Sequence, residues 1–162
     1  MTHNARANRS APDRFRHAAA AMGLTVEIIT QATRAHTAVE AAAACGCDVS
    51  QIVKSLVFRG VESGRPILLL VSGSNRVNED RVAEQIGEEI ERAQPTWVRA
   101  VTGYAIGGIP PLGHAQPIAT FLDEVLLDHV DVWAAAGTSD TTFKCVPDQL
   151  VEVTGAKVIA MR

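Results

Sequence analysis

The sequence predicts a mixed α/β fold, a single domain in which short helices surround a curved, mostly antiparallel mixed sheet. Three observations support this prediction. The chain has 162 residues, a length typical of one domain with a full hydrophobic core. Strand-like and helix-like segments alternate along the chain without a repeating βαβ unit. Tight turns join some of the expected strands, as in antiparallel sheets.

The first sixty residues predict two helices and two strands. In the first helix, apolar residues recur at helical spacing between a proline and a glycine. Thr37 and Glu40 have the pattern of a capping box, which opens an alanine-rich second helix. The strands are rich in β-branched and apolar residues. In chain order these elements are expected at residues 12–22, 25–29, 38–46 and 50–60.

The middle of the chain predicts a hairpin followed by two helices. Residues 62–65 form the expected turn of the hairpin. Asn78 is suited to cap the next helix, which ends before Gly87. Pro95 can start the other helix, which Gly103 closes. In order, the second hairpin strand, a helix, a short strand and a helix are expected at residues 66–71, 78–86, 89–92 and 95–103.

The last third predicts mostly strands. Four segments have the composition of strands, a helical turn is expected at 123–127, and a helix over 147–154 is stopped by Gly155. The strands are expected at residues 117–121, 130–136, 141–145 and 156–160.

Composition limits the function classes. The net charge is −3, from 15 basic and 18 acidic residues, which argues against binding nucleic acid by bulk electrostatics. No apolar run reaches the length of a membrane span, so no membrane role is expected. The three cysteines cannot all pair within the chain, and free thiols favour a reducing, cytoplasmic location. Cys45-Gly46-Cys47 lacks the second ligand pair of a structural zinc site, so no metal is expected.

The stretch from Gly103 to His114 is the most informative segment. It contains four glycines and two prolines in twelve residues. Gly107 and Gly108 allow the backbone to approach a ligand closely, while Pro110 and Pro111 stiffen the chain. The loop either only turns the chain or offers its remaining N–H groups to an anion or a developing oxyanion.

Lys54 is unusual for its strand. Because side chains alternate along a strand, it shares a face with Ile52, Leu56 and Phe58. Lysine is seldom buried unless it is paired. Lys54 is therefore either an edge-strand residue whose ammonium reaches water or a fixed cation at the mouth of a pocket.

These residues together resemble a known family. Lys54 within Ile52-Val53-Lys54-Ser55-Leu56, and the Gly-x-x-x-Pro-x-x-His pattern of Gly107, Pro111 and His114, are similar to the YbaK/EbsC family. That family comprises aminoacyl-tRNA deacylase domains inserted in, or related to, prolyl-tRNA synthetase. Further matches follow in the family's order at residues 37–43, 69–73, 98–104, 132–138 and 150–156.

The resemblance divides the chain and implies its function. Residues 1–24 are expected to be an N-terminal segment with a short helix, and residues 25–162 the editing domain. The implied function is trans-editing: hydrolysis of mischarged aminoacyl-tRNA, expected to be proline tRNA carrying Ala, Cys or another small amino acid. The implied partners are the acceptor end with its 3′-terminal adenosine and, as a candidate, prolyl-tRNA synthetase. No cofactor is expected.

The resemblance also assigns roles to residues. Lys54 would hold a carbonyl oxygen or the terminal phosphate, and amides around Gly107 and Gly108 would bind the ester carbonyl or the attacking water. The expected substrate-binding residues are Ser55, Pro111, His114, Gly137, Thr138 and Asp140. His114 could instead order the loop, and Asp140 could bind an α-ammonium group or serve only as a turn residue.

Several alternatives stay open at this stage. Ser55 stands where alanine-clearing members often have asparagine and cysteine-clearing members have threonine, so the amino acid is not fixed. Any tRNA contact must be local, with Arg14, Arg16, Arg34, Arg59 and Arg76 as candidates to touch phosphates. The chain could also be a non-catalytic module that binds a nucleotide or an RNA 3′ end, or a regulatory protein that kept the fold.

Overall fold

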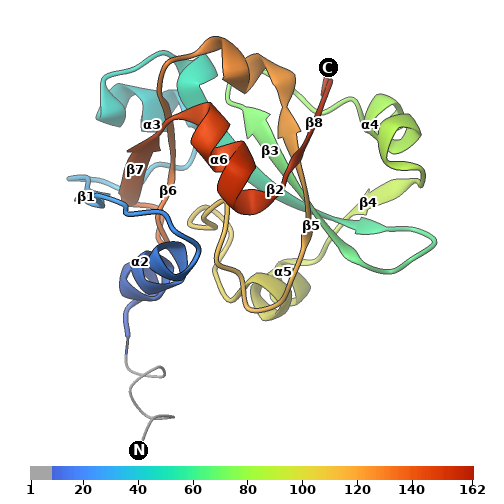
Figure 1. Cartoon of the computed structure of the whole chain (residues 1–162), viewed down its shortest axis with the longest axis horizontal. Coiled ribbons are helices and arrows are strands. Elements are labelled where there is room, and N and C mark those ends of the chain that lie inside the picture. The colour runs from blue at the N-terminus through green and yellow to red at the C-terminus, as the bar shows by residue number, and fades with distance from the viewer. Residues whose placement is uncertain (1–8) are drawn as a thin grey trace, which may run out of the picture.

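An eight-stranded mixed sheet forms the centre of the computed structural model, which describes residues 9–162 (Figure 1). The strand order is β1-β7-β6-β2-β3-β5-β8, and β4 pairs with β2 outside this path. Four pairings are antiparallel and three are parallel. The strands are β1 (Ile29–Thr30), β2 (Ile52–Gly60), β3 (Pro66–Ser72), β4 (Ile90–Arg92), β5 (Ala119–Asp123), β6 (Val132–Ala135), β7 (Thr141–Cys145) and β8 (Lys157–Ile159).

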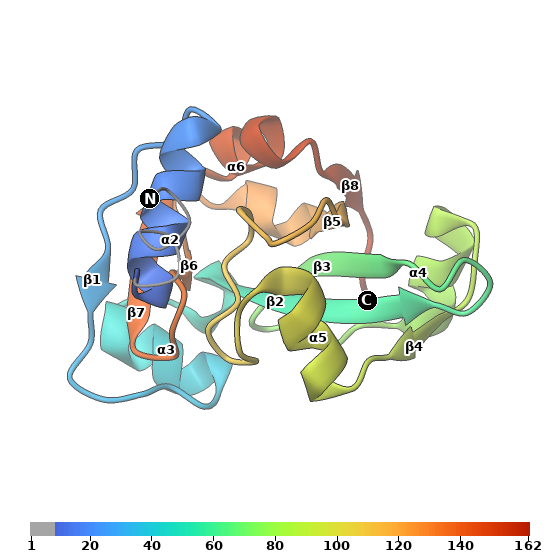
Figure 2. The ribbon, with the colours of Figure 1, turned by 90° about the horizontal axis from the view of Figure 1, so that it is seen from below.

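Helices cover both faces of this sheet. Phe15, Val98 and Leu150, from α2, α5 and α6, belong to one buried cluster, and Val82 from α4 belongs to a second cluster. Figure 2 shows α2 and α5 on the same side of the sheet, with the loop that follows α5 between them. The helices are α2 (Ala11–Ala21), α3 (Ala38–Cys45), α4 (Glu79–Ile86), α5 (Pro95–Thr102) and α6 (Pro147–Thr154), with short 3₁₀ segments η1 (Val49–Gln51) and η2 (Glu124–Asp128).

The central strand β3 explains how one sheet separates two cores. Leu68 and Leu70 contribute to the cluster beneath α2, α5 and α6, while Leu69 and Val71 contribute to the cluster beneath α4. Successive side chains of a strand point to opposite faces, so a continuous apolar run is buried on both sides. The predicted mixed α/β class with short helices around one sheet is confirmed.

Capping residues fix the helices close to their expected positions. The Thr37 hydroxyl accepts a hydrogen bond from the Glu40 N–H at 3.1 Å, and the Asn78 side chain accepts one from the Arg81 N–H at 3.1 Å. These bonds satisfy N–H groups that have no partner within the helix. All five predicted helices are present, each within two residues of its expected bounds.

One expected strand is wrong in extent. Of residues 25–29 only Ile29 is in a strand, and β1 consists of Ile29 and Thr30, paired with Thr142 and Thr141 of β7. Val26 and Ile28 pack against the main cluster without a strand partner. These two residues are apolar because they pack against the core, and not because they pair with another strand. Within residues 9–162, no helix is long and apolar enough to cross a membrane.

Candidate active site at the end of strand β2

Lys54 and Gly107 border the same cavity, which has a volume of about 250 Å³. The lysine comes from β2, and the glycine comes from the loop that follows α5. The cavity also touches the segment before α3 and the strands β6 and β7. Residues far apart in the sequence thus meet around one space, as the two predicted features required.

The cavity wall is apolar with a few polar groups. Ile52, Leu56, Ile106 and Ile109 form part of the apolar wall, together with Trp133 and several alanines. The polar side chains are Lys54, Ser55, His36 and the hydroxyls of Thr37, Thr138, Ser139, Thr141 and Thr142. No carboxylate and no second lysine or arginine is among the described residues that line the cavity, so Lys54 is its fixed cation.

The Lys54 ammonium is held from outside the cavity. Its Nζ donates a hydrogen bond to the main-chain oxygen of Asn75 at 2.5 Å. Burial lowers the pKa of Lys54, the negative charge of Asp123 opposes this shift, and the positive charge of Arg76 adds to it. The ammonium is therefore half-buried and anchored rather than extended into water.

A buried carboxylate supports that anchor. The Asp123 side chain is fully buried and accepts hydrogen bonds from the Asn75 side-chain amide at 2.9 Å and the Ser72 N–H at 3.1 Å. Its other oxygen accepts from the Val125 N–H at 3.2 Å. Sequence reasoning missed Asn75 and Asp123. The only available signal was an acidic residue at the end of an apolar strand.

The two glycines of the loop have different roles. Gly107 borders the cavity, and its N–H has no hydrogen-bond partner among residues 9–162. The Gly108 N–H donates to the Ala105 oxygen at 3.0 Å, so it is not available to a ligand. The Gly108 oxygen accepts from the Gly137 N–H at 3.0 Å. Of the two amides predicted to bind the substrate, the structure leaves that of Gly107 free.

Close contact between Gly108 and the next turn sets the position of the loop. A Cβ on Gly108 would lie 2.6 Å from the Thr138 Cα and 2.8 Å from the Gly137 oxygen. Gly137 itself has φ +119°, a backbone conformation that favours glycine. The Gly/Pro loop can approach the turn at 137–140 this closely because Gly108 has no side chain, whereas a Cβ on Gly137 would lie 2.8 Å from the Ala11 oxygen at the start of α2.

The turn at 137–140 presents Thr138 to the cavity and keeps Asp140 out of its wall. The Thr138 hydroxyl donates to the Asp140 carboxylate at 2.6 Å and lies 2.8 Å from the Thr141 hydroxyl. Gly137 and Asp140 do not line the cavity. The structure thus gives Asp140 the turn interaction that the sequence left as an alternative to binding an ammonium group.

Ser55 borders the cavity, but its buried hydroxyl makes no hydrogen bond to the described residues. Among the described residues, the Ser55 Oγ is the only buried side-chain oxygen or nitrogen without a hydrogen-bond partner. Most buried polar groups have a partner, so this oxygen is a candidate contact for a ligand.

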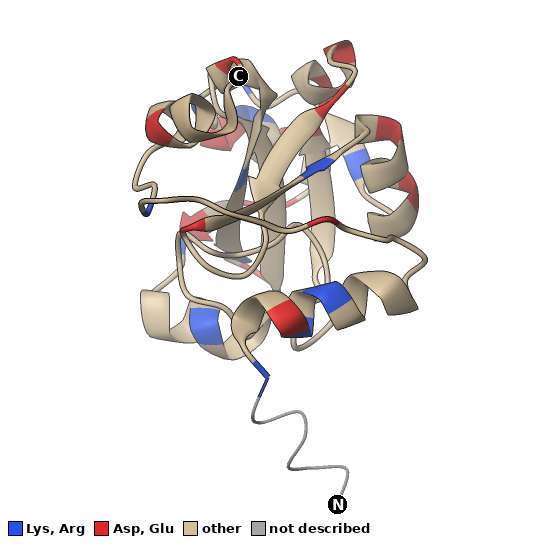
Figure 3. Ribbon diagram, turned by 90° about the vertical axis from the view of Figure 1, so that its left-hand side faces the viewer, with Lys and Arg blue, Asp and Glu red and all other residues tan. Residues whose placement is uncertain are grey.

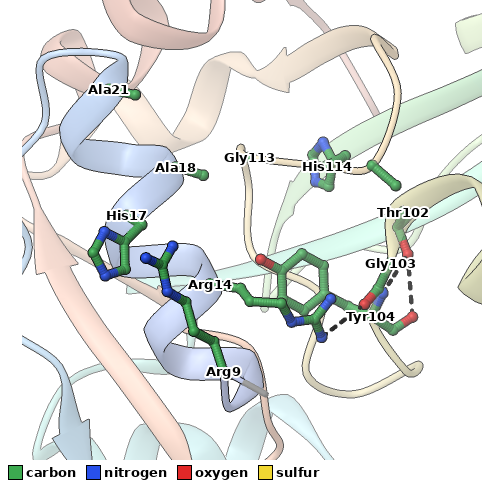
Figure 4. A pocket seen from close by; sticks show the side chains of 11 residues that line it. Arg9, Arg14, His17, Ala18, Ala21, Thr102, Gly103, Tyr104, Gly113 and His114 are labelled. Atoms are coloured by element: carbon green, nitrogen blue, oxygen red, sulfur yellow. Dashed lines mark hydrogen bonds between the residues drawn. The ribbon is translucent and has the colours of Figure 1, made fainter. Parts of the chain in front are cut away.

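Pro111 and His114 lie outside the cavity that contains Lys54. The His114 Nε2 lies 2.8 Å from the Pro110 oxygen, a hydrogen bond within the loop itself. Burial lowers the pKa of His114, and the bond to Pro110 opposes that shift, so the ring is neutral at pH 7. His114 instead borders a second pocket of about 370 Å³ between α2 and the loop (Figure 4).

In that second pocket, a cation links α2 to the end of α5. The Arg14 guanidinium donates to the Gly103 oxygen at 3.1 Å and lies 5.0 Å from the centre of the Tyr104 ring. Figure 4 shows Arg14 facing Gly103 and Tyr104, with His114 beside Gly113 and away from the guanidinium. These contacts brace the base of the loop.

Cysteine chemistry and metal binding find no support in this region. Burial raises the pKa of Cys47 to about 11 and that of Cys145 to about 12, so both thiols stay protonated at neutral pH and are poor nucleophiles. Among residues 9–162, no group of three or more His, Cys, Asp or Glu side chains is placed to hold a metal ion.

Comparison with known proteins places this geometry in a family. The family model of the aminoacyl-tRNA editing domain matches residues 32–153. YwhH of Bacillus subtilis (strain 168) is 31% identical over 126 residues, which are 78% of this chain and 80% of YwhH. The proline–tRNA ligase of Limosilactobacillus fermentum is 32% identical over 124 residues, which are 74% of this chain but only 21% of the ligase.

A solved structure shares both fold and sequence. The crystal structure of a candidate trans-editing enzyme for prolyl-tRNA synthetase has a TM-score of 0.89 and 40% identity to this chain. The match covers 95% of this chain and 98% of that protein. The resemblance read from Lys54 and the glycine loop is confirmed, and the chain belongs to the family of aminoacyl-tRNA editing domains.

Proposed function

We propose that this protein hydrolyses the ester of mischarged aminoacyl-tRNA in trans, acting on proline tRNA that carries alanine, cysteine or another small amino acid. One observation carries the proposal: the anchored Lys54 ammonium and the free Gly107 amide border one cavity with no carboxylate in its wall. Membership in the editing-domain family supports a deacylase, and the likeness to a candidate trans-editing enzyme supports an association with prolyl-tRNA synthetase.

The chemistry needs positioning and charge stabilisation more than a nucleophilic side chain. Water adds to the ester carbonyl carbon and turns the carbonyl oxygen into an oxyanion, and the bond from that carbon to the ribose oxygen then breaks. The proton that the water loses is taken up by the ribose oxygen, which leaves a free amino acid and uncharged tRNA. A fixed cation and a main-chain N–H in a water-poor site stabilise an oxyanion strongly. Lys54 and Gly107 fill these roles in the proposal.

The size and lining of the cavity favour a small aminoacyl group. About 250 Å³ is below the usual range for ligand pockets. The α-ammonium group of the substrate would meet hydroxyls such as Thr138 and Ser139, since the wall contains no carboxylate. Ser55, which lines the cavity and whose hydroxyl has no hydrogen-bond partner among the described residues, is proposed to help discriminate between side chains. A second site that hydrolyses esters of small amino acids is needed because the active site of a synthetase discriminates only weakly against smaller analogues.

The test compares Lys54→Ala with Lys157→Ala, a control at an exposed lysine of β8 in the same sheet. The substrates are tRNAs carrying alanine, cysteine, serine and proline, with loss of the ester followed over time. Lys54→Ala should reduce kcat by about 100-fold or more, the usual loss for one oxyanion-stabilising group, while Lys157→Ala keeps wild-type activity. A folded Lys54→Ala protein with the wild-type rate would remove the lysine from the mechanism. Tight binding of the 3′ adenosine without hydrolysis would favour the non-catalytic module.

A further inference from the structure

Strand β2 has a gap in the pairing of one edge. Its first edge pairs with β3 along Val53–Arg59. On the second edge, β6 pairs only with Ile52 and Val53, and β4 pairs only with the segment Phe58–Gly60. No strand among the described residues therefore pairs with positions 54–57 on that edge.

Hydrogen-bond alternation shows which main-chain groups face the gap. The Ile52 oxygen accepts from the Gly73 N–H and the Gly60 N–H donates to the Arg65 oxygen, both on the β3 side. Main-chain groups of an antiparallel strand alternate between its two edges. The N–H and C=O groups of Ser55 and Val57 therefore point into the gap, and within residues 9–162 no loop hydrogen bond satisfies them.

A groove of about 700 Å³ runs along this gap and joins the candidate active site. Lys54, Ser55, Leu56, Ile106 and Ile109 border both the groove and the smaller cavity. The groove is thus an extension of the proposed site, beginning at the Lys54 ammonium.

Basic side chains flank the groove. Arg76, which precedes α4, and Arg92 of β4 both line it and are both exposed. Glu79 is the only acidic residue in its lining. The single ion pair in the described part of the chain joins Arg16 and Asp13, so neither groove arginine is neutralised by a carboxylate. In a chain with net charge −3, the groove thus has three basic residues, Lys54, Arg76 and Arg92, against one acidic residue.

We propose that this groove binds the single-stranded RNA immediately before the terminal adenosine of the acceptor end. Arg76 and Arg92 bind its phosphates, and the main-chain groups of Ser55 and Val57 bind ribose hydroxyls or base edges. An extended peptide fits less well, because two unpaired residues offer too short an edge for strand addition and the arginines would face no charge. The proposal rests on the proposed function, since it places the rest of the substrate relative to Lys54.

The decisive experiment compares a long and a short substrate. Steady-state deacylation is measured with aminoacyl-tRNA and with the same amino acid esterified to adenosine alone, which lacks the upstream phosphates. Arg92→Ala should raise KM for aminoacyl-tRNA about five- to ten-fold with kcat unchanged, as expected for loss of a charge-assisted contact. It should not change the hydrolysis of aminoacyl-adenosine. Arg76→Ala should raise KM for aminoacyl-tRNA by a similar factor, and its effect on aminoacyl-adenosine measures separately the loss of a positive charge near Lys54. Arg99→Ala, at an exposed arginine of α5 outside the groove, is the matched control.

Binding of an uncharged RNA minihelix ending in CCA, followed by fluorescence anisotropy, separates this proposal from the proposed function. If the wild type hydrolyses no ester, the deacylase proposal fails, but weaker minihelix binding by Arg92→Ala would still support the groove. An unchanged KM for aminoacyl-tRNA in both arginine variants, or an equal effect of Arg92→Ala on aminoacyl-adenosine, would overturn the groove assignment. So would tight binding of an extended peptide that competes with the minihelix.

Discussion

Lys54 depends on two residues that line neither the active-site cavity nor the groove along β2. Its ammonium is bound by the Asn75 main-chain oxygen, and the Asn75 side chain is bound by the fully buried Asp123 carboxylate. The same carboxylate supplies the negative charge that opposes the lowering of the Lys54 pKa by burial. A single buried acid thus both positions the lysine and favours its charged form.

Replacing that acid should affect stability and the pH profile together. Asp123→Asn leaves three N–H donors with a weaker, partly mismatched acceptor, so the free energy of unfolding should fall by about 1–3 kcal/mol. Without the carboxylate charge, the Lys54 pKa should fall further below its ordinary value. Because the charged ammonium is the active form, enzymatic deacylation should then decline at a lower pH than in the wild type. Urea denaturation and pH–rate profiles, corrected for spontaneous ester hydrolysis, measure the two effects.

The neighbouring residue supplies the control for this prediction. Glu124 is an exposed carboxylate next in the chain, and Glu124→Gln should change neither the stability nor the profile. If Asp123→Asn is less stable but its deacylation rate declines at the same alkaline pH as in the wild type, the carboxylate supports the fold without acting on the lysine.

Among individual side chains, the sequence identified those that carry local signals. Lys54, Ser55, Gly107 and Thr138 all line the cavity. Pro111 and His114 were grouped with them because they share a motif with Gly107, but the chain turns between these positions and His114 bonds within the loop. Asn75 and Asp123 could not be found, because their roles arise from a contact across 48 residues of sequence.

At the scale of elements, the site depends on the docking of two loops. The Gly/Pro loop after α5 and the turn between β6 and β7 meet through the bond from the Gly137 N–H to the Gly108 oxygen. Since a Cβ on Gly108 would lie under 3 Å from backbone atoms of this turn, only a shift of one loop could make room for it. That shift would move the neighbouring Gly107 amide away from the cavity.

Gly108→Ala should therefore reduce activity out of proportion to stability. Overpacking of this kind destabilises a protein by about 1–3 kcal/mol. The displaced amide should also lower kcat by at least about ten-fold, since oxyanion stabilisation depends on the exact donor position. Deacylation kinetics and thermal unfolding of the same preparation check both parts.

A second glycine offers a control of similar stability cost. Gly155 ends α6 with φ +66° and has open space around its Cβ position, so Gly155→Ala strains the backbone by about 1–2 kcal/mol without moving a loop. That variant should keep wild-type kcat. Equal losses of kcat in the two variants would mean that activity follows global stability rather than the position of the Gly107 amide.

The difference between local and long-range interactions explains how much of the fold was predictable. Helices α3 and α4 begin where Thr37 and Asn78 cap them, and such signals lie within a few residues of each other. Strand pairing is a long-range property. Nothing near Ile52 or Val53 indicates that β2 pairs in parallel with β6, nor that its edge is left open after Val53. The groove along β2 therefore became visible only in the structure.

At the scale of the whole molecule, charge is dispersed rather than gathered into one basic face. The chain carries 15 basic and 18 acidic residues. Figure 3 shows acidic and basic residues interspersed over the helices and strands of one side. RNA affinity must then come from a few phosphate contacts, which for the proposed groove are those of Arg76 and Arg92, with Lys54 as a third cation at its end.

The salt dependence of RNA binding tests the proposed number of phosphate contacts. Each phosphate neutralised on a single strand contributes about −0.7 to the slope of log affinity against log salt concentration, so two or three contacts give a slope of about −1.4 to −2.1. Anisotropy titrations of the uncharged minihelix between low and moderate salt would measure it. Arg92→Ala should make the slope shallower by about 0.7, while Arg99→Ala should leave it unchanged. A wild-type slope steeper than about −5 would require seven or more phosphates and would mean that the RNA lies over a surface far wider than this groove.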